Sequence, residues 1–537
     1  MAPENNTTLD AVVVGAGFSG LYMLHRLRDI LGLDARVLEA GDGVGGTWYW
    51  NRYPGARCDS ESYYYSYSFS EDLEQEWEWT SKYPDQPEIL RYLEHVADRF
   101  DLLRDIQLET RVTEAAFDAE TNRWKIFTQR GEHFEAKFLI TAVGCLSAAN
   151  IPDIPGLDDF DGDWYHTGAW PHQGVDFSGK RVGLIGTGST GIQATPVIAA
   201  EADHLTVFQR TPNFSVPARN APLGKEQWAT IKSDYRDIRR RTRETSSGFP
   251  YKPVERSALQ ATQAERTEVY EDLWGKGGFS FLWGSFNDVM RDKEANDTVA
   301  EFIRDKIREV VKDPVVAERL LPVDHPYGAK RPPIDTDYFE TFNRKNVTLV
   351  DIRQDPITAI TQDGLHTKNA EFELDTLVLA TGFDAMTGAL LNIDIRGSEG
   401  LRLADKWVEG PRTYLGLQVS GFPNLFTITG PGSPSVLTNM PVSIELHVEW
   451  ISDCIQHMRD NALETIEASQ EAEDRWVEHV SDVAKETLLG QADSWYLGAN
   501  IPGKTRVVMP YPGGHFEYRK RCEKIARNGY SGFDLSR

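Results

Sequence analysis

The sequence predicts an α/β fold with two Rossmann-like dinucleotide-binding domains, one inserted into the other, and a helical insertion. The main observation is a pair of glycine-rich turns with the spacing G-x-G-x-x-G, which begin at Gly15 and Gly186. Each turn follows a β-branched, apolar strand and opens an apolar helical pattern. One such turn alone is a weak indication, because glycine-rich turns also arise for structural reasons. Two copies in the same context predict two nucleotide sites.

The first turn contains Gly15, Gly17 and Gly20, and the strand after its helix ends in Glu39. Glycines let backbone amides approach a pyrophosphate at a helix N-terminus, where the partial positive charge favours an anion. A carboxylate about 20 residues further on accepts hydrogen bonds from ribose hydroxyls and repels a 2′-phosphate. The first site is therefore predicted to bind FAD.

The second turn runs from Gly186 to Gly191, and the strand after its helix ends in Arg210. A guanidinium at that place attracts the 2′-phosphate that distinguishes NADPH from NADH. The second site is therefore predicted to bind NADPH.

Domain boundaries follow from two further strand-like runs that end in small residues, at 138–144 and 376–382. The complete second turn lies between these runs, which are interpreted as the crossings between the domains. A proline-rich stretch at 151–155 follows the first crossing, as expected of a linker. We expect an FAD-binding domain of residues 1–145 and 384–537, an NADPH-binding domain of 151–222 and 331–383, and a helical insertion of 223–330.

The expected insertion is rich in charge and carries apolar residues at helical spacing. Examples are Val299, Phe302, Ile303, Ile307 and Val310. It is expected to pack against the NADPH-binding domain or to shape a substrate cleft. A basic run at 239–243 is more consistent with a solvated helix face than with a functional patch.

Composition excludes several classes of function. The chain has 537 residues, 40% hydrophobic and 26% charged, with a net charge of −25, which argues against a nucleic-acid partner. The N-terminus lacks the pattern of a secretory signal, and the apolar run at 278–286 is too short to span a bilayer. Four dispersed cysteines contain no C-x-x-C pair, which disfavours a redox dithiol. We therefore expect a cytoplasmic protein with no membrane partner.

Two further motifs resemble those of a known family. Residues 160–171, FDGDWYHTGAWP, match the fingerprint F-x-G-x-x-x-H-x-x-x-W-[P/D] of type I Baeyer–Villiger monooxygenases. Residues 45–59, GGTWYWNRYPGARCD, are similar to the family motif G-G-x-W…[F/Y]-P-G-x-x-x-D. The pair Trp170-Pro171 separates the chain from related N- and S-oxidising flavin monooxygenases. The resemblance covers nearly the whole chain, and within the family it is strongest to phenylacetone and steroid monooxygenases.

The resemblance implies an enzyme that uses FAD and NADPH to convert a ketone and O2 into an ester or lactone through a flavin peroxide. The ketone is expected to be bulky, cyclic or aromatic, and no metal is implied. Arg331 matches the family's active-site arginine, whose fixed positive charge would stabilise oxygen-centred anions. Asp59 matches the carboxylate beside it, which would hold the guanidinium in place. A surface arginine and a helix- or turn-capping aspartate are the structural alternatives.

The resemblance also implies cofactor and substrate contacts. Lys330 is expected to join Arg210 in holding the 2′-phosphate, and Trp495 matches a tryptophan on a mobile loop that contacts NADP in relatives. A buried core aromatic is the alternative for Trp495. Leu437 and Met440 are the expected pocket walls. The full set of expected cofactor-binding residues is Gly15, Gly17, Gly20, Glu39, Gly46, Thr47, Trp48, Asp59, Tyr65, Val112, Thr187, Gly188, Ser189, Thr190, Gly191, Gln193, Arg210, Thr211, Lys330 and Trp495.

The fingerprint histidine, His166, is not expected to be a catalytic acid or base, because the fingerprint lies at the domain connection and is thought to couple NADPH binding to domain movement. Two other functions remain open at this point. One is a flavin monooxygenase that oxidises nitrogen or sulfur, for which no activating arginine is needed. The other is a non-catalytic redox sensor that binds both dinucleotides.

Overall fold

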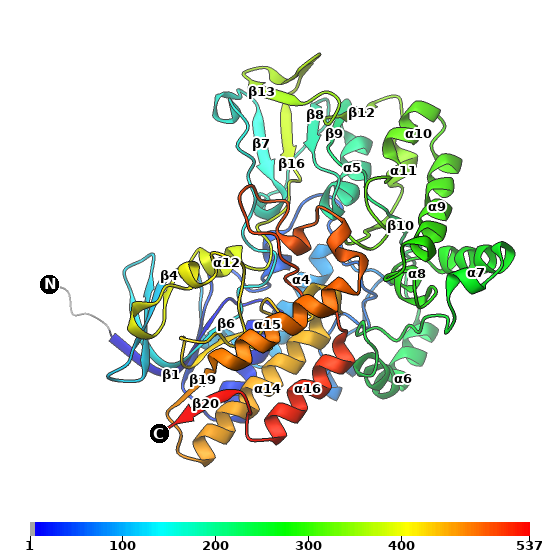
Figure 1. Cartoon of the computed structure of the whole chain (residues 1–537). Helices are drawn as coiled ribbons and strands as arrows, with labels where there is room; N and C mark the ends of the chain where they lie inside the picture. Colours follow the sequence, from blue (N-terminus) through cyan, green and yellow to red (C-terminus); the bar gives the residue numbers. More distant parts are fainter. Residues whose placement is uncertain (1–5) are drawn as a thin grey trace.

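Two separate β-sheets organise the chain, and each carries one of the glycine-rich turns (Figure 1). The structure is a computed structural model and describes residues 6–537. Helices cover the sheets, and a further group of helices lies beside both of them. The predicted fold class, α/β with two nucleotide-binding units, is confirmed.

The larger sheet has eight strands in the order β17-β4-β5-β6-β1-β2-β3, and β18 also pairs with β6. Strand β5 is antiparallel to its neighbours β4 and β6, and the other pairs are parallel. The second half of the central strand β1, residues 11–14, is a buried apolar run, as expected of a strand covered on both faces. The strands are β1 (Asn6–Val14), β2 (Ala35–Leu38), β3 (Ile106–Gln107), β4 (Val112–Asp118), β5 (Arg123–Thr128), β6 (His133–Thr141), β17 (Asp394–Arg396) and β18 (Leu425–Thr427).

Helices from both ends of the chain pack around this sheet. Helix α1 follows the first glycine turn, continues as a π-helix over Arg26–Ile30, and packs against α14. Leu21 and Leu24 of α1 share a buried apolar cluster with Val448 and Ile451 of α14. The helices are α1 (Phe18–His25), α2 (Thr47–Trp50), α3 (Glu71–Glu76), α4 (Gln86–Arg99), α12 (Gly388–Leu391), α13 (Leu403–Lys406), α14 (Met440–Asp460), α15 (Gln470–Lys485) and α16 (His515–Arg527). The two-stranded antiparallel sheet of β19 (Thr465–Ala468) and β20 (Phe533–Ser536) lies near α14.

The smaller sheet is entirely parallel, with the strand order β12-β9-β8-β16-β7. Helix α5 (Ser189–Glu201) follows the second glycine turn, and α11 (Tyr338–Thr341) packs beside it. A small antiparallel sheet, which the sequence did not predict, adjoins this unit (Figure 1). The strands are β7 (Asp163–His166), β8 (Arg181–Ile185), β9 (His204–Gln209), β12 (Val347–Asp351) and β16 (Thr376–Leu379), with β13 (Ile357–Thr361), β14 (Gly364–Thr367) and β15 (Glu371–Glu373) in the small sheet.

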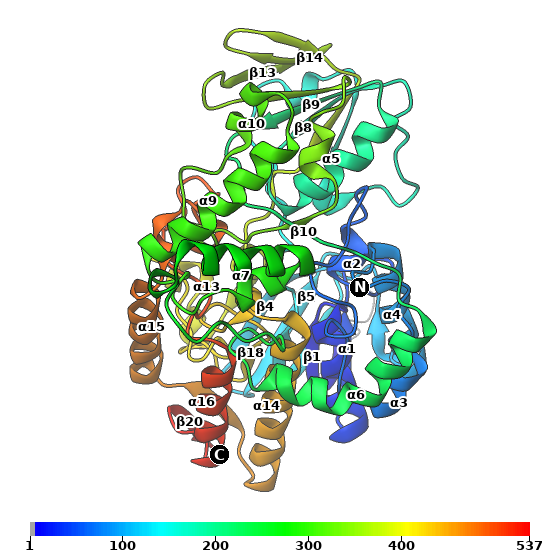
Figure 2. The same cartoon turned by 90° about the vertical axis from the view of Figure 1, so that its right-hand side faces the viewer.

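The segment between β9 and β12 is mainly helical and touches both units (Figure 2). Helix α6 packs against α3 of the larger unit, whereas α9 packs against α11 of the smaller unit. Side-chain caps define several starts, because Asp292 accepts from the Ala295 N–H and Thr262 from the Glu265 N–H. The elements are α6 (Lys225–Arg243), α7 (Gln263–Lys276), α8 (Phe279–Gly284), α9 (Lys293–Val310) and α10 (Pro314–Leu320), with the short parallel pair β10 (Val216–Pro217) and β11 (Ile334–Asp335).

Two connections join the sheets, and they run side by side. Strand β6 ends at Thr141 and strand β16 ends at Leu379. The small residues that close the runs at 138–144 and 376–382 therefore lie at the start of the connections and not in the strands. The Asn150 N–H donates to the Gly382 carbonyl at 2.9 Å, and the Asp384 N–H donates to the Ala148 carbonyl at 2.8 Å. Within residues 6–537, no helix has the length and apolar character that a bilayer crossing requires.

Candidate active site

The first glycine turn is closely packed, which explains its residue types. Gly15 has φ +104°, and a Cβ there would lie 2.7 Å from the Ala142 carbonyl oxygen. A Cβ on Gly20 would lie 1.8 Å from the Gly15 carbonyl oxygen, so neither position tolerates a side chain. Glu39 is buried and accepts hydrogen bonds from the Ala16 N–H at 2.7 Å and the Gly41 N–H at 2.8 Å. Its carboxylate therefore lies against the turn, where a ribose would be bound.

The second glycine pair of the sequence, Gly45-Gly46, closes over the first turn. A Cβ on Gly46 would lie 2.8 Å from the Gly17 Cα, so two backbones approach each other directly. Helix α2 then begins at Thr47, and the Trp48 indole donates to the Tyr65 hydroxyl at 3.2 Å. The Tyr65 ring in turn contacts Phe18, the first residue of α1.

Val112 is buried at the start of β4, in one apolar cluster with Val14 and Leu38 at the ends of β1 and β2. The nearby Thr110 N–H donates to the Glu39 carbonyl at 2.7 Å. The residues expected around the first nucleotide therefore lie close together in the structure.

The second glycine turn leaves space for a ligand. A Cβ on Gly188 would meet no atom within 4 Å, and no side chain caps the N-terminus of α5. The free N–H groups at Ser189 and Thr190 can therefore face an anion, as a pyrophosphate site requires. Behind them, a Cβ on Gly191 would lie 2.1 Å from the Gly186 carbonyl oxygen, which keeps the turn tight.

Two basic side chains lie beyond this turn. Arg210 follows β9 and is exposed, while Thr211 is fixed because its carbonyl accepts from the Thr187 hydroxyl at 2.8 Å. Burial lowers the pKa of Lys330, and the positive charge of Arg210 lowers it further, whereas Asp324 raises it. Arg210 and Lys330 are therefore near neighbours, and a 2′-phosphate between them would relieve their repulsion.

Arg331 and Asp59 form an ion pair, with 3.5 Å between Nε and Oδ2. The Arg331 Nη1 donates to the Val436 carbonyl at 3.1 Å, and its Cζ lies 4.8 Å from the centroid of the Phe279 ring. These partners come from the loop after α2, from the short 3-10 helix Ser435–Leu437 and from α8. The Asn213 amide also donates to the Arg331 carbonyl at 3.3 Å. Segments from across the chain thus fix one guanidinium.

Asp59 and Arg331 each stabilise the charged form of the other. Burial raises the pKa of Asp59, and Arg331 and the Gln193 amide oppose that rise. Burial lowers the pKa of Arg331, but Asp59 and other groups more than offset it, so the net pKa is raised. Arg331 therefore remains a cation across the physiological pH range.

Gln193 of α5 joins the two nucleotide units. Its Nε2 donates to the Asp59 Oδ1 at 3.2 Å, and its Oε1 accepts from the Tyr53 hydroxyl at 2.8 Å. Both Asp59 carboxylate oxygens thus face side chains, Arg331 on one side and Gln193 on the other. This arrangement favours the pairing role of Asp59 over the capping alternative.

Sequence reasoning missed Tyr496. It lies on the short 3-10 helix Trp495–Leu497, is 3% exposed, and packs with Val436 and Met386. Burial raises its pKa to about 12, while the adjacent Arg331 lowers it, so the phenol stays protonated beside the guanidinium. Only its place directly after Trp495 could have drawn attention to it, because no spacing rule marks a tyrosine in a loop.

The expected substrate-side residues lie in the same region. Leu437, Met440 and Trp495 are partly buried against the cluster that contains Tyr496. The Trp495 ring centroid is 4.4 Å from that of Tyr496. The predicted pocket wall, the predicted loop tryptophan and Arg331 are therefore brought together.

The fingerprint residues lie elsewhere, at the connections between the units. His166 ends β7, is buried, and accepts from the Gly168 N–H at 3.0 Å. Burial lowers its pKa, so the ring is neutral, and it lies near Phe383 of the return connection. Trp170 is buried against Tyr165 and Phe177. These positions agree with a structural role at the connection.

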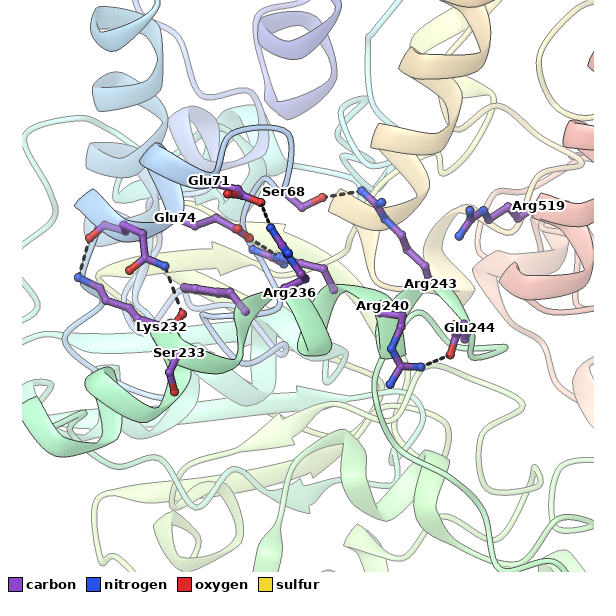
Figure 3. Close-up of a pocket in the computed structure, with 13 residues that line it drawn as sticks. Ser68, Glu71, Glu74, Lys232, Ser233, Arg236, Arg240, Arg243, Glu244 and Arg519 are labelled. Atoms are coloured by element: carbon purple, nitrogen blue, oxygen red, sulfur yellow. Dashed lines mark hydrogen bonds and ion pairs between the residues drawn. The ribbon is translucent and has the colours of Figure 1, made fainter.

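A cavity of about 560 Å³ lies away from all of these residues, between α3 and α6 (Figure 3). Among the described residues, no group of histidine, cysteine, aspartate and glutamate side chains could hold a metal ion.

Comparisons with known proteins agree with this geometry. Residues 10–219 match the family model described as flavin-binding monooxygenase-like. A Baeyer–Villiger monooxygenase from Pseudooceanicola batsensis is 45% identical, with 98% of this chain and 97% of that protein covered. A phenazine N-monooxygenase from Lysobacter antibioticus is 43% identical, covering 100% of this chain and 98% of that protein.

The solved structure of an oxidized steroid monooxygenase bound to NADP is 53% identical, with a TM-score of 0.95 over 99% of this chain and 100% of that one. The resemblance inferred from the motifs is thus confirmed. With two nucleotide turns, a paired arginine and such identity over the whole chain, this protein belongs to the Baeyer–Villiger monooxygenases.

Proposed function

We propose that this protein binds FAD and NADPH and inserts one atom of O2 beside the carbonyl group of a ketone, giving an ester or lactone. The Arg331–Asp59 pair is the observation that carries the proposal, because it places a fixed, charged donor next to the junction of the two nucleotide units. The residues around both glycine turns fit these cofactors, with a buried carboxylate at one and two basic side chains at the other.

Bound FAD, once reduced by NADPH, would activate O2 for insertion. Arg331 would stabilise the negative charges that develop on oxygen before and after attack on the carbonyl. Such stabilisation is strongest when the donor is already oriented. Asp59, the Val436 carbonyl and the Phe279 ring provide that orientation without using every guanidinium N–H.

The apolar cluster around Tyr496 would exclude water from the reacting groups. Val436, Met386 and Tyr496 are buried there, and Leu437 and Met440 lie at its margin. Exclusion of water strengthens the electrostatic action of Arg331. A wall of aliphatic side chains favours a bulky cyclic or aromatic ketone over a small polar one.

The negative net charge and the free, dispersed cysteines support a cytoplasmic enzyme that needs no nucleic acid.

The test is product analysis by mass spectrometry after incubation of the FAD-loaded protein with NADPH and a mixture of cyclic, aromatic and steroidal ketones. Wild type should give esters or lactones with one added oxygen. Arg331→Ala should lower product formation by about 100-fold or more, because a preorganised charged donor is lost. Arg291→Ala, which removes an exposed arginine paired with Glu486, is the control and should keep full activity.

Ketone oxidation at near wild-type rate in Arg331→Ala would show that the mechanism is wrong. Slow NADPH consumption with no product from any ketone would instead favour the redox-sensor hypothesis.

Oxidation of a heteroatom is the second candidate function, favoured by the identity to a phenazine N-monooxygenase. A nitrogen nucleophile needs no stabilised carbonyl adduct, so phenazine oxidation should survive in Arg331→Ala better than ketone oxidation. An N-oxide formed without any ester from the ketone panel would favour this function.

A further inference from the structure

Two cavities adjoin each other at the C-terminal end of α6. The first, of about 560 Å³, lies between α6 and α3, and the second, of about 360 Å³, is bordered by α14 and α16. Arg243 of α6 and Arg519 of α16 line both cavities. Figure 3 shows that the two side chains come from different helices and that Arg243 reaches toward Ser68.

The first cavity is rich in cations, although the whole chain carries a net charge of −25. Its walls include Lys232, Arg236, Arg239, Arg240, Arg243 and Arg519. Most of these have a close carboxylate partner: Arg236 pairs with Glu71 at 3.0 Å and Arg239 with Glu74 at 2.6 Å. Such pairs belong to ordinary packing between helices.

Arg243 is different. Its Nη2 donates to the Ser68 hydroxyl at 2.9 Å, and its ion pair with Glu445 is long, at 3.9 Å. Glu445 already accepts from both the N–H and the hydroxyl of Ser68. Arg519 uses only its Nε toward Glu523, at 2.7 Å. Among the hydrogen bonds of residues 6–537, the terminal amino groups of Arg519 are therefore not used.

A buried histidine lines the second cavity together with these two arginines. His515, the first residue of α16, is 1% exposed, lines the second cavity, and has an Nδ1 atom with no partner in the described part of the chain. Burial lowers its pKa to about 3, with further lowering by Arg519 and Arg243. The ring is thus neutral, and both arginines line the same cavity.

Carboxylates also line the second cavity, and each has a partner. Glu445 accepts from Ser68, Glu449 accepts from the Tyr22 hydroxyl at 3.3 Å, and Glu523 accepts from Arg519. Burial raises the pKa of both Glu445 and Glu449, and Asp453, which also lines this cavity, pairs with Arg26 at 3.0 Å. These partners offset part of the repulsion that the carboxylates exert on an anion at Arg243 and Arg519.

We propose that Arg243, Arg519 and His515 bind a phosphate-type oxyanion. Guanidinium groups bind phosphate oxygens through paired N–H donors, and a neutral imidazole adds one further hydrogen bond. The proposal goes beyond the oxygenation reaction and does not depend on it.

The site is connected to the proposed substrate wall. The backbone N–H of His515 donates to the Ser246 carbonyl at 2.7 Å, and the backbone N–H of Asn439 donates to the Ser247 carbonyl at 3.0 Å. Asn439 directly precedes Met440. A bound oxyanion would therefore link α6 and α16 beside the segment that carries this wall.

The anion has two possible sources, free phosphate or a phosphoryl group on a larger molecule. Calorimetric titration distinguishes them, with inorganic phosphate in one series and pyrophosphate in the other. The FAD-loaded protein is kept saturated with NADP+, so that the dinucleotide phosphate sites are filled, and chloride matches the ionic strength. Equal affinities would indicate free phosphate, and tighter binding of pyrophosphate would indicate a larger ligand.

Arg243→Gln and Arg519→Gln should each weaken binding by about tenfold, as expected for loss of a charge-assisted hydrogen bond. Arg236→Gln is the matched control, because Arg236 lies on the same helix and lines the same first cavity but pairs with Glu71. Its affinity should stay unchanged. Flavin content and the melting temperature show whether each variant is folded.

Absence of phosphate binding by wild type at matched ionic strength would overturn the proposal. An equal loss in Arg236→Gln would also overturn it, since the arginines would then form only a solvated helix face.

Discussion

Three contacts fix the Arg331 guanidinium, and each restricts it in a different way. Asp59 pairs with its charge, the Val436 carbonyl accepts a hydrogen bond from it, and the face of the Phe279 ring packs against it. The ion pair is long, with 3.5 Å between Nε and Oδ2. It stabilises the site by offsetting the free-energy cost of burying two charges. A lysine would keep the charge but could not make this set of contacts, because it lacks the planar fork.

Tyr496 offers a test of this environment at the residue scale. Tyr496→Phe keeps the buried ring and removes the hydroxyl beside Arg331. Ester formation should fall by roughly 5-fold, because loss of one hydrogen bond near a charge is worth about 1 kcal/mol. Steady-state kinetics should show a lower kcat with an unchanged KM for NADPH.

Tyr414→Phe provides the comparison, since that hydroxyl donates to the Ser531 carbonyl at 3.1 Å, outside the candidate active site. Equal kinetic constants for Tyr496→Phe and wild type would exclude a role of the phenol.

At the scale of elements, the short pair β10 and β11 holds the loop that carries Arg331. The Asp335 carboxylate of β11 accepts from the Ser215 hydroxyl just before β10, and it is 8% exposed. Burial raises the pKa of Asp335 to about 7, with smaller contributions from Glu340 and Asp337 and opposition from Ser215. The folded protein therefore binds this proton more tightly than the unfolded chain does.

The stability contribution of Asp335 is therefore fully present below pH 3.8 and is lost as the pH rises through about 7. Asp335→Asn removes this titration. At pH 8.5 the variant should have the higher melting temperature, through a free energy of unfolding larger by at most about 4 kcal/mol. At pH 5, only a little above 3.8, the difference should be smaller, at most about 1.6 kcal/mol.

Melting temperatures from pH 5 to 8.5 test this expectation. Asp234→Asn is the control, because Asp234 is exposed on α6 and is not among the groups that shift the pKa of Asp335. A difference between Asp335→Asn and wild type that does not change with pH would contradict the assignment.

Elements also show how far the sequence could predict the structure. The glycine turns were predictable because backbone angle and close packing, as at Gly15 and Gly20, are local demands that few other residues meet. The Arg331–Asp59 pair was predictable only through family motifs. Phe279 and Tyr496 were not predicted, because their positions depend on how α8 and the Trp495 segment pack against a distant loop. The small sheet β13–β15 was missed for a similar reason.

At the scale of the whole molecule, the two units are joined at the paired connections and through Gln193. The C-terminal segment adds a third link, because the Asn500 amide donates to the Phe383 carbonyl at 2.8 Å. Lys504 forms an ion pair with Asp384 and donates to the Ala385 carbonyl at 3.0 Å. The segment that carries Trp495 and Tyr496 thus also holds the return connection. The position of the return connection and the ordering of the active-site residues Trp495 and Tyr496 are thereby coupled.

This coupling predicts the effect of Lys504→Met, which keeps the aliphatic stem and removes the charge. An ion pair of this partly exposed kind contributes only about 1 kcal/mol to stability, so the melting temperature should change little. The return connection should nevertheless become more mobile, and the nicotinamide and ketone sites should be less well aligned. NADPH consumed per ester formed should rise by roughly twofold or more, given the sensitivity of catalysis to small displacements. Hydrogen–deuterium exchange at residues 382–386 should be faster than in wild type.

Lys485→Met gives the matched comparison, because Lys485 is exposed on α15 and pairs with Asp482 three residues before it. That variant should retain wild-type coupling and exchange. If Lys504→Met also retained both, the link between the C-terminal segment and the return connection would be purely structural. The alignment of the two nucleotide units would then depend on other contacts, among them Gln193, the Arg331–Asp59 pair and the paired connections.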